Sequence, residues 1–132
     1  MASVTMIAAV AVGEVIGAIL HFWANLIVGA SLIGVAGPSA TLLLNVVGLG
    51  LMGCLAGAIA TGMISPEAWR GFFAISLLGA LTTFSSFALA ADQLRQKQGM
   101  VMAGAYVMAS LLLSLLAIGA GFWAVGHSGI WQ

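Results

Sequence analysis

Long apolar segments, separated by short polar stretches, make up almost the whole chain. The apolar segments are residues 4–30, 40–61, 68–94 and 100–125. Glycine, proline and charged residues mark the stretches between them, at 37–39, 62–67 and 95–99. Each segment has at least 20 residues, which is the length a helix needs to cross about 30 Å of hydrocarbon. The pattern predicts one domain over residues 1–132, built from four transmembrane helices.

The composition indicates a membrane protein and argues against several soluble classes. Of the 132 residues, 63% are hydrophobic and 5% are charged, whereas soluble domains carry about 25% charged residues. So few charges cannot cover a surface in contact with water, so we expect an all-α membrane protein surrounded by the lipid bilayer. The formal net charge is zero, which argues against a nucleic-acid partner. The chain also has no nucleophile with a base, no phosphate loop and no metal-ligand spacing, so we do not expect an enzyme.

Hydroxyl groups gather in the middle of the third apolar segment, where burying a polar group is costly. Thr82, Thr83, Ser85 and Ser86 lie within five residues, close to the midpoint of 68–94. One interpretation is a helix broken near the membrane midplane, because hydroxyls can satisfy the freed backbone groups and Gly79 loosens the helix. Such a break exposes carbonyl oxygens to a cation and amides to an anion. The alternative is an unbroken helix whose hydroxyls bond the carbonyls four residues back.

Other polar side chains in the membrane are candidates for function. Asn45 supplies two amide donors, although it also suits a hydrogen bond between helices. Tyr106, Ser110 and Ser114 are four residues apart and form one polar stripe, unless their hydroxyls bond back to their own helix.

Two aromatic and two ionisable residues add further candidates. Phe84 and Phe87 share a helix face, and their positively polarised ring edges can stabilise an anion, although packing or lipid contact is the more usual role of such residues in a membrane helix. Glu14 and His21 are two helical turns apart on one side of the first segment. Either residue suits a proton site, an interface or a vestibule.

Small residues recur every four positions, at Ala9, Gly13 and Gly17, and at Gly53, Gly57 and Thr61. Such rows let helix backbones approach closely, either between subunits or within one chain. Four helices in one chain form a thin bundle, in which a water-filled path is hard to build. We therefore expect an oligomer.

Positive charge is almost equally divided between the two predicted membrane faces. We expect Arg70 and the N-terminal amine, if it is unblocked, on one face, and Arg95 and Lys97 on the other. Because lysine and arginine near helix ends set orientation, the chain can insert both ways and pair as an antiparallel dimer. The alternative is that a difference of one charge suffices to orient it.

The polar motifs resemble those of the small CrcB (Fluc) fluoride channels. The run GALTTFSSF at 79–87 is similar to the third-helix signature of that family, Gly-Gly-x-Thr-Thr-Phe-Ser-Thr-Phe. TLLLNVVGLGLMG at 41–53 resembles its second-helix pattern, and GEVIGAILHF at 13–22 resembles its first-helix pattern Gly-Gly-x-x-Gly-Ala-x-x-Arg-Tyr. The resemblance covers all four segments, with His21 in place of the usual arginine and Glu14 in place of a glycine.

The resemblance implies a specific function and architecture. It implies a fluoride-specific channel that exports fluoride passively and electrogenically, built as a dual-topology antiparallel homodimer with two pores in a bacterial inner membrane. Gly79 and Thr82 would bind a structural sodium ion through their backbone carbonyls, and His21 would lie in the vestibule. The fluoride pathway would comprise Asn45, Thr83, Phe84, Ser85, Phe87, Tyr106, Ser110 and Ser114.

Two other functions are compatible with four short transmembrane helices. The first is a small multidrug-resistance-type proton/cation antiporter, which would use Glu14 as its membrane carboxylate. The second is a purely structural or regulatory membrane subunit. The antiporter gives no reason for the hydroxyl cluster with its two phenylalanines, or for Asn45, and the structural subunit predicts no flux in liposomes. The fluoride channel is the preferred hypothesis.

Overall fold

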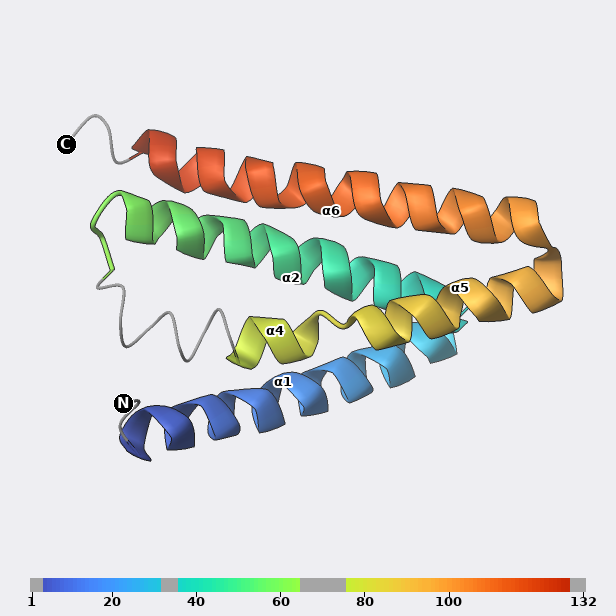
Figure 1. The fold of residues 1–132 in the computed structure, drawn as a ribbon, viewed down its shortest axis with the longest axis horizontal. Helices are drawn as coiled ribbons and strands as arrows, with labels where there is room; N and C mark the ends of the chain where they lie inside the picture. The colour runs from blue at the N-terminus through green and yellow to red at the C-terminus, as the bar shows by residue number, and fades with distance from the viewer. Residues whose placement is uncertain (1–3, 32–35, 65–75, 129–132) are drawn as a thin grey trace.

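The computed structural model describes residues 4–31, 36–64 and 76–128, and helices are the only regular elements in them. The helices are α1 (Val4–Ser31), α2 (Ala36–Ala60), α4 (Leu78–Leu81), α5 (Phe84–Gln98) and α6 (Met100–Ser128) (Figure 1). α1, α2 and α6 are each long and apolar enough to cross a membrane. The described residues are therefore all-helical and indicate a multi-pass membrane protein, as predicted. Of the four predicted transmembrane helices, three qualify as spans, and the start of the third segment, with Arg70, lies outside the described residues.

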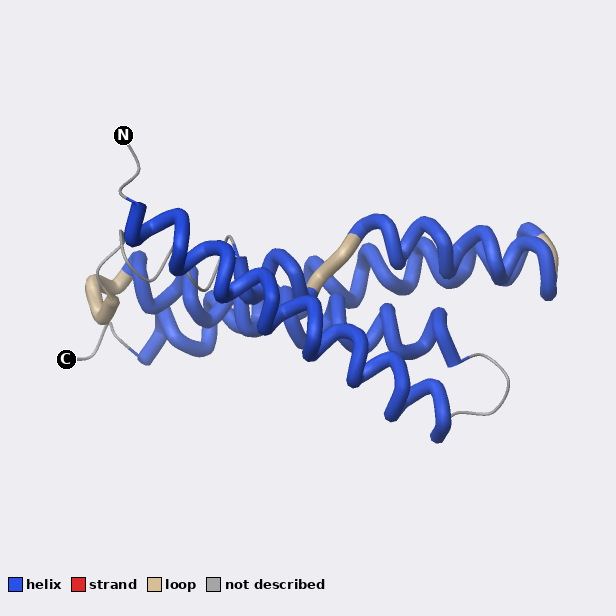
Figure 2. The backbone as a smooth tube through the Cα atoms, turned by 90° about the horizontal axis from the view of Figure 1, so that it is seen from below, coloured by secondary structure: helices blue, strands red, loops and turns tan. Residues whose placement is uncertain are grey.

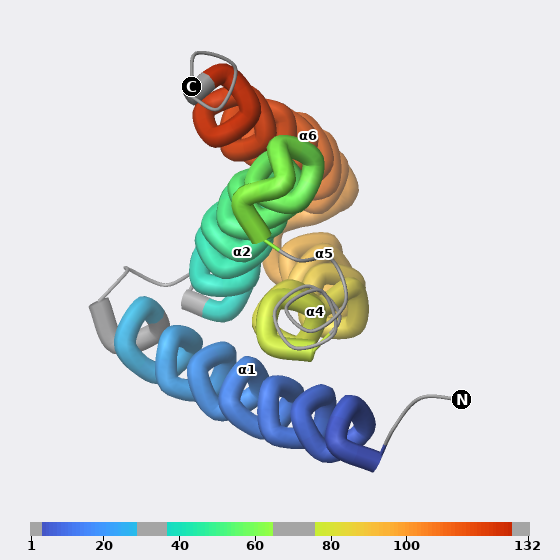
Figure 3. Tube along the Cα trace, turned by 90° about the vertical axis from the view of Figure 1, so that its left-hand side faces the viewer, coloured from blue at the N-terminus to red at the C-terminus, as the bar shows by residue number. Residues whose placement is uncertain are grey.

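The helices run roughly along one common direction (Figure 1). α2 and α6 lie side by side, α4 and α5 follow one another beside α2, and α1 contacts both α2 and α4. Viewed end-on, α1 lies on the opposite side of α4 and α5 from α6 (Figure 3). The start of α1, the end of α2 and the end of α6 share one end of the bundle, in agreement with the alternation expected from the sequence.

The third segment is broken, as one of the two sequence interpretations predicted. α4 ends at Leu81, and Thr82 and Thr83 are extended, with φ/ψ of −99°/117° and −129°/129°. α5 begins at Phe84, and the change of conformation lies near the middle of the molecule (Figure 2). The unbroken helix is excluded. We call Thr82–Thr83 the break.

Two predicted helix limits are wrong. The Gly-Pro-Ser at 37–39 was expected to form a loop, but it lies in the first turn of α2, which begins at Ala36. Proline is tolerated there because the first amides of a helix have no acceptor within it. α5 also continues past the expected end at Leu94 to Gln98, and Gly99, with φ of 90°, makes the turn into α6.

The small-residue rows pack helices within this chain. A Cβ at Gly17 would lie 2.5 Å from the Leu77 carbonyl oxygen beside α4. A Cβ at Gly53 would collide with the Ile118 carbonyl of α6, and a Cβ at Gly57 would meet the same helix one turn further on. Glycine is required at these contacts because the backbones approach too closely for any side chain.

Candidate ion site at the broken helix

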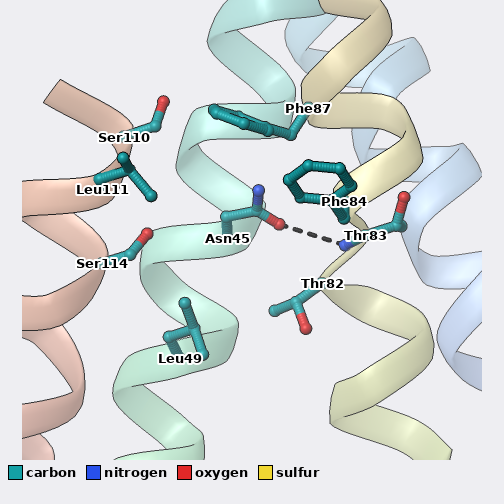
Figure 4. A pocket seen from close by; sticks show the side chains of 9 residues that line it. All are labelled: Asn45, Leu49, Thr82, Thr83, Phe84, Phe87, Ser110, Leu111 and Ser114. Carbon is teal, nitrogen blue, oxygen red and sulfur yellow. Dashed lines mark hydrogen bonds between the residues drawn. The ribbon is translucent and has the colours of Figure 1, made fainter. Parts of the chain in front are cut away.

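A pocket with polar and aromatic walls opens beside the break, with a volume of about 320 Å³. α2, the break, α5 and α6 all contribute to it (Figure 4). Its lining residues are Asn45, Leu49, Thr82, Thr83, Phe84, Phe87, Ser110, Leu111 and Ser114. We call it the break pocket. Three segments that are distant in the sequence therefore meet at the point where the third segment loses its helical structure.

Side chains satisfy the backbone groups that the break releases. The Thr83 amide N–H donates to Asn45 Oδ1, 3.3 Å away, instead of to a carbonyl of its own helix. Thr83 Oγ1 accepts a 3.0 Å hydrogen bond from the Ser86 amide and so caps the N-terminus of α5. Thr82 Oγ1 donates to the Leu78 carbonyl at 2.8 Å, which is the back-bonding predicted for the alternative of an unbroken helix. The hydroxyl cluster thus allows an irregular backbone within the membrane.

Two carbonyl oxygens lose their helical donors because of these bonds. In a continuous helix, the amide four residues later donates to each carbonyl. The Thr83 amide would serve Gly79, and the Ser86 amide would serve Thr82, but both amides bond to side chains. Gly79 and Thr82 are the two residues that the resemblance implies as sodium ligands. Carbonyl oxygens suit a hard cation, so the residues present fit that ion.

Gly48 on α2 makes room for the break. A Cβ at this position would collide with the methyl group of Thr82. Because Thr82 Oγ1 is bonded to Leu78, the threonine side chain cannot rotate away without losing that hydrogen bond. The glycine three residues after Asn45 therefore lets α2 contact the break closely.

The two ends of the Asn45 amide face different groups. Its oxygen points at the Thr83 N–H, and its nitrogen is turned toward Phe87 (Figure 4). The oxygen therefore holds the break, while the NH₂ group, with two donors, remains available in the break pocket.

The polar stripe of α6 lies on a buried face. Ser110 and Ser114 are 3% and 8% exposed, and both line the break pocket. Neither Ser110 Oγ nor the Tyr106 hydroxyl has a hydrogen-bond partner within the part of the chain that the structure describes. Back-bonding is therefore wrong as an explanation of Ser110. A buried hydroxyl without a partner is costly, so these two hydroxyls are candidates to bind a ligand.

The two phenylalanine rings lie against each other at the edge of the break pocket. Their centroids are 5.6 Å apart at an interplanar angle of 44°. Phe87 also stacks on the Tyr106 ring at 5.7 Å. Phe84 is 79% exposed, so within one chain most of its ring contacts nothing.

Six of the eight residues predicted for the pathway line the break pocket: Asn45, Thr83, Phe84, Phe87, Ser110 and Ser114. Ser85 does not, and its hydroxyl instead lies 2.9 Å from Thr83 Oγ1. Tyr106 lies outside the lining as well, one helical turn from Ser110. The sequence interpretation missed the apolar walls formed by Leu49 and Leu111. Leu49 follows Asn45 by four residues, so its shared helix face could have indicated it.

His21 lies in a second pocket, which we call the α1 pocket. Its walls come from α1, the start of α2 and α5, and its polar members are His21, Asn25, Thr41, Ser86 and Gln93. His21 Nδ1 lies 2.8 Å from the Leu81 carbonyl oxygen, immediately before the break. Glu14 is exposed on α1. His21 of α1 and Asn45 of α2 therefore contact two successive peptide groups, the first ending at Thr82 and the second ending at Thr83.

Comparison with known proteins agrees with the motifs. The family model described as "CrcB-like protein, Camphor Resistance (CrcB)" matches residues 8–122. A protein of Caulobacter vibrioides named "Fluoride-specific ion channel FluC" is 40% identical over 116 residues, which cover 85% of this chain and 88% of that protein. Proteins with the same name from Paramagnetospirillum magneticum and Methylobacterium nodulans are 36% and 33% identical, over 86% and 89% of this chain and 90% and 94% of their own. The chain belongs to the CrcB family.

Proposed function

We propose that the protein is a fluoride channel that lets fluoride leave the cytoplasm passively and electrogenically. The break pocket is the observation that carries this proposal, because it gathers hydrogen-bond donors without a basic side chain. The names of the relatives support it, since each is called a fluoride-specific ion channel.

The chemistry of the pocket suits a small, strongly hydrated anion. A pore must replace the water around fluoride with other donors, and the Asn45 amide and the Ser110 hydroxyl are two such groups. The polarised edges of Phe84 and Phe87 add weaker attraction. Among the residues that the structure describes, no lysine or arginine lines the pocket, so none of them would hold the ion with a full positive charge.

Sodium is proposed as a structural ion beside this path. The Gly79 and Thr82 carbonyls would hold it, together with the same groups of a second copy. When bound, the cation supplies a fixed positive charge near the anion path without any ionisable side chain.

An antiparallel homodimer is proposed as the working unit. The break pocket opens at the surface of the single chain, and the exposed Phe84 ring lies at its edge. A second copy in the opposite orientation would cover both and close two equivalent pores. We place the dimer in a bacterial inner membrane, where neutral hydrogen fluoride enters, ionises inside and must leave as the anion.

Fluoride efflux from proteoliposomes tests the proposal. Purified protein is reconstituted in liposomes loaded with potassium fluoride, and release is followed with a fluoride electrode, with and without valinomycin as a potassium shunt. We expect release of fluoride only with the shunt, and no release of chloride under the same conditions. Proton-coupled uptake of an organic cation would instead favour the Glu14 antiporter, and complete lack of transport would favour a structural subunit.

A further inference from the structure

The peptide group between Leu81 and Thr82 is held from both sides. Its N–H, on Thr82, donates to the Leu78 carbonyl at 3.0 Å. Its carbonyl, on Leu81, lies 2.8 Å from His21 Nδ1. A carbonyl oxygen only accepts, so Nδ1 carries the proton and donates. Because a peptide group is planar, these two hydrogen bonds together fix its orientation.

The position of His21 depends on a close contact one turn earlier. A Cβ at Gly17 would lie 2.5 Å from the Leu77 carbonyl oxygen and 2.8 Å from Ala80 Cβ, so α1 touches the backbone beside α4 there. His21 follows four residues later on the same face and therefore reaches past Ala80 to the last carbonyl of α4.

The next peptide group, between Thr82 and Thr83, is held by Asn45 through the Thr83 amide. Its carbonyl belongs to Thr82 and must point away from Asn45, because the C=O and N–H of a trans peptide point in opposite directions. Two successive peptide groups are thus held by two side chains, one from α1 and one from α2.

We propose that His21 is a positioning residue for the break: its Nδ1–H replaces the helical donor that Leu81 has lost and holds the adjacent Thr82 carbonyl in place. The donor replaced is the Ser85 amide, which a continuous helix would have offered to Leu81. Only the expected effect of His21 on fluoride transport rests on the proposed function. The histidine side chain has only two rotatable bonds, so little side-chain entropy is lost when it makes this hydrogen bond.

Hydrogen exchange of the full-length protein tests this role directly. His21→Leu removes the donor at similar size, and incorporation of an Nδ1-methylated histidine at position 21 removes it while keeping the ring. His21→Asn returns a donor near the Nδ1 position, and His127→Leu changes the histidine at the end of α6 as a matched control. Exchange is measured by mass spectrometry on peptides from the break and from α6, in parallel with fluoride efflux at several sodium concentrations.

We expect the break peptides of the first two variants to exchange about tenfold faster, the factor that one hydrogen bond to a buried carbonyl contributes. Exchange in α6 should stay unchanged, His21→Asn should restore protection, and His127→Leu should behave like wild type. More sodium should also be needed for half-maximal efflux in the donor-free variants.

Three results would overturn the inference: wild-type exchange at the break in both donor-free variants, equal acceleration in α6, or failure of His21→Asn to restore protection. If wild-type protein releases no fluoride, the proposed function fails while the exchange data still decide the role of His21. If efflux is normal but exchange does not respond to the variants, only the role of His21 is rejected.

Discussion

The substitution Asn45→Asp separates the two tasks of the Asn45 side chain. Aspartate keeps an oxygen where Oδ1 accepts from the Thr83 amide, so the break should remain intact. It replaces the NH₂ group, which faces the break pocket, by an acceptor that is ionised near neutral pH. An anion path should therefore lose a donor and gain a negative charge without a change of shape.

The magnitude follows from the position of that group. An ion bonded to the amide nitrogen would lie about 3 Å from it, hence about 4 Å from the centre of the new carboxylate. At that distance two like charges repel by about 4 kcal/mol with an effective dielectric constant of about 20. The lost hydrogen bond to an ion adds about 1.5–3 kcal/mol. Since each 1.4 kcal/mol is a factor of ten, we expect fluoride efflux to fall at least about a thousandfold.

Proteoliposome efflux measures the effect, with Asn25→Asp as a matched control. Asn25 lies in the α1 pocket and donates to the His21 carbonyl at 3.0 Å, so the same chemical change there should lower efflux by less than about tenfold. Size-exclusion chromatography and hydrogen exchange in α6 are used to establish that both variants are folded. Efflux within tenfold of wild type in folded Asn45→Asp protein would refute the assignment of the Asn45 amide to the anion path.

Three further predictions concern the rings, the sodium ion and the membrane orientation. Phe84→Ile and Phe87→Ile should each strongly reduce efflux, because isoleucine keeps much of the volume but has no polarised edge. If either variant releases fluoride as fast as wild type, the ring concerned serves only in packing. Exchange of sodium for a large organic cation should lower efflux or dimer stability, and a protein unaffected after exhaustive exchange would count against a sodium site at Gly79 and Thr82. Two lysines added within residues 95–99, at the end of α5, or two at the C-terminus, should each lock one orientation, so that cells resist fluoride only when both variants are expressed and reach the membrane. Full resistance with one locked variant would exclude the antiparallel dimer.

The location of the break could be predicted from sequence, but the roles of its hydroxyls could not. Four hydroxyls in the middle of an apolar segment indicate where a helix can break, although the sequence was equally compatible with an unbroken helix whose hydroxyls bond the carbonyls four residues back. Which hydroxyl faces the pocket depends on helical phase, and the break resets that phase at Thr82. Consequently Thr83 and Ser85, which were given the same role, differ: Thr83 lines the pocket and caps α5, whereas Ser85 lies outside the pocket.

Long-range contacts were beyond the sequence interpretation. The resemblance implied a vestibule position for His21 but not its hydrogen bond, which joins residues 60 positions apart. Spacing along one helix carries no information about which carbonyl of another segment is free to accept. The start of α2 was misjudged for a different reason, since Pro38 was taken to end a loop although proline is equally suited to the first turn of a helix.

The chemical nature of the break pocket has a consequence for acid tolerance. Its lining consists of asparagine, threonine, serine, phenylalanine and leucine, and none of these side chains gains or loses a proton between pH 5 and 8. The proposed sodium ligands are backbone carbonyls, which do not titrate either. Hydrogen fluoride crosses membranes fastest in acidic surroundings, so cells need export most when protons are abundant. The donors that line the break pocket would therefore keep the same charge as the medium acidifies.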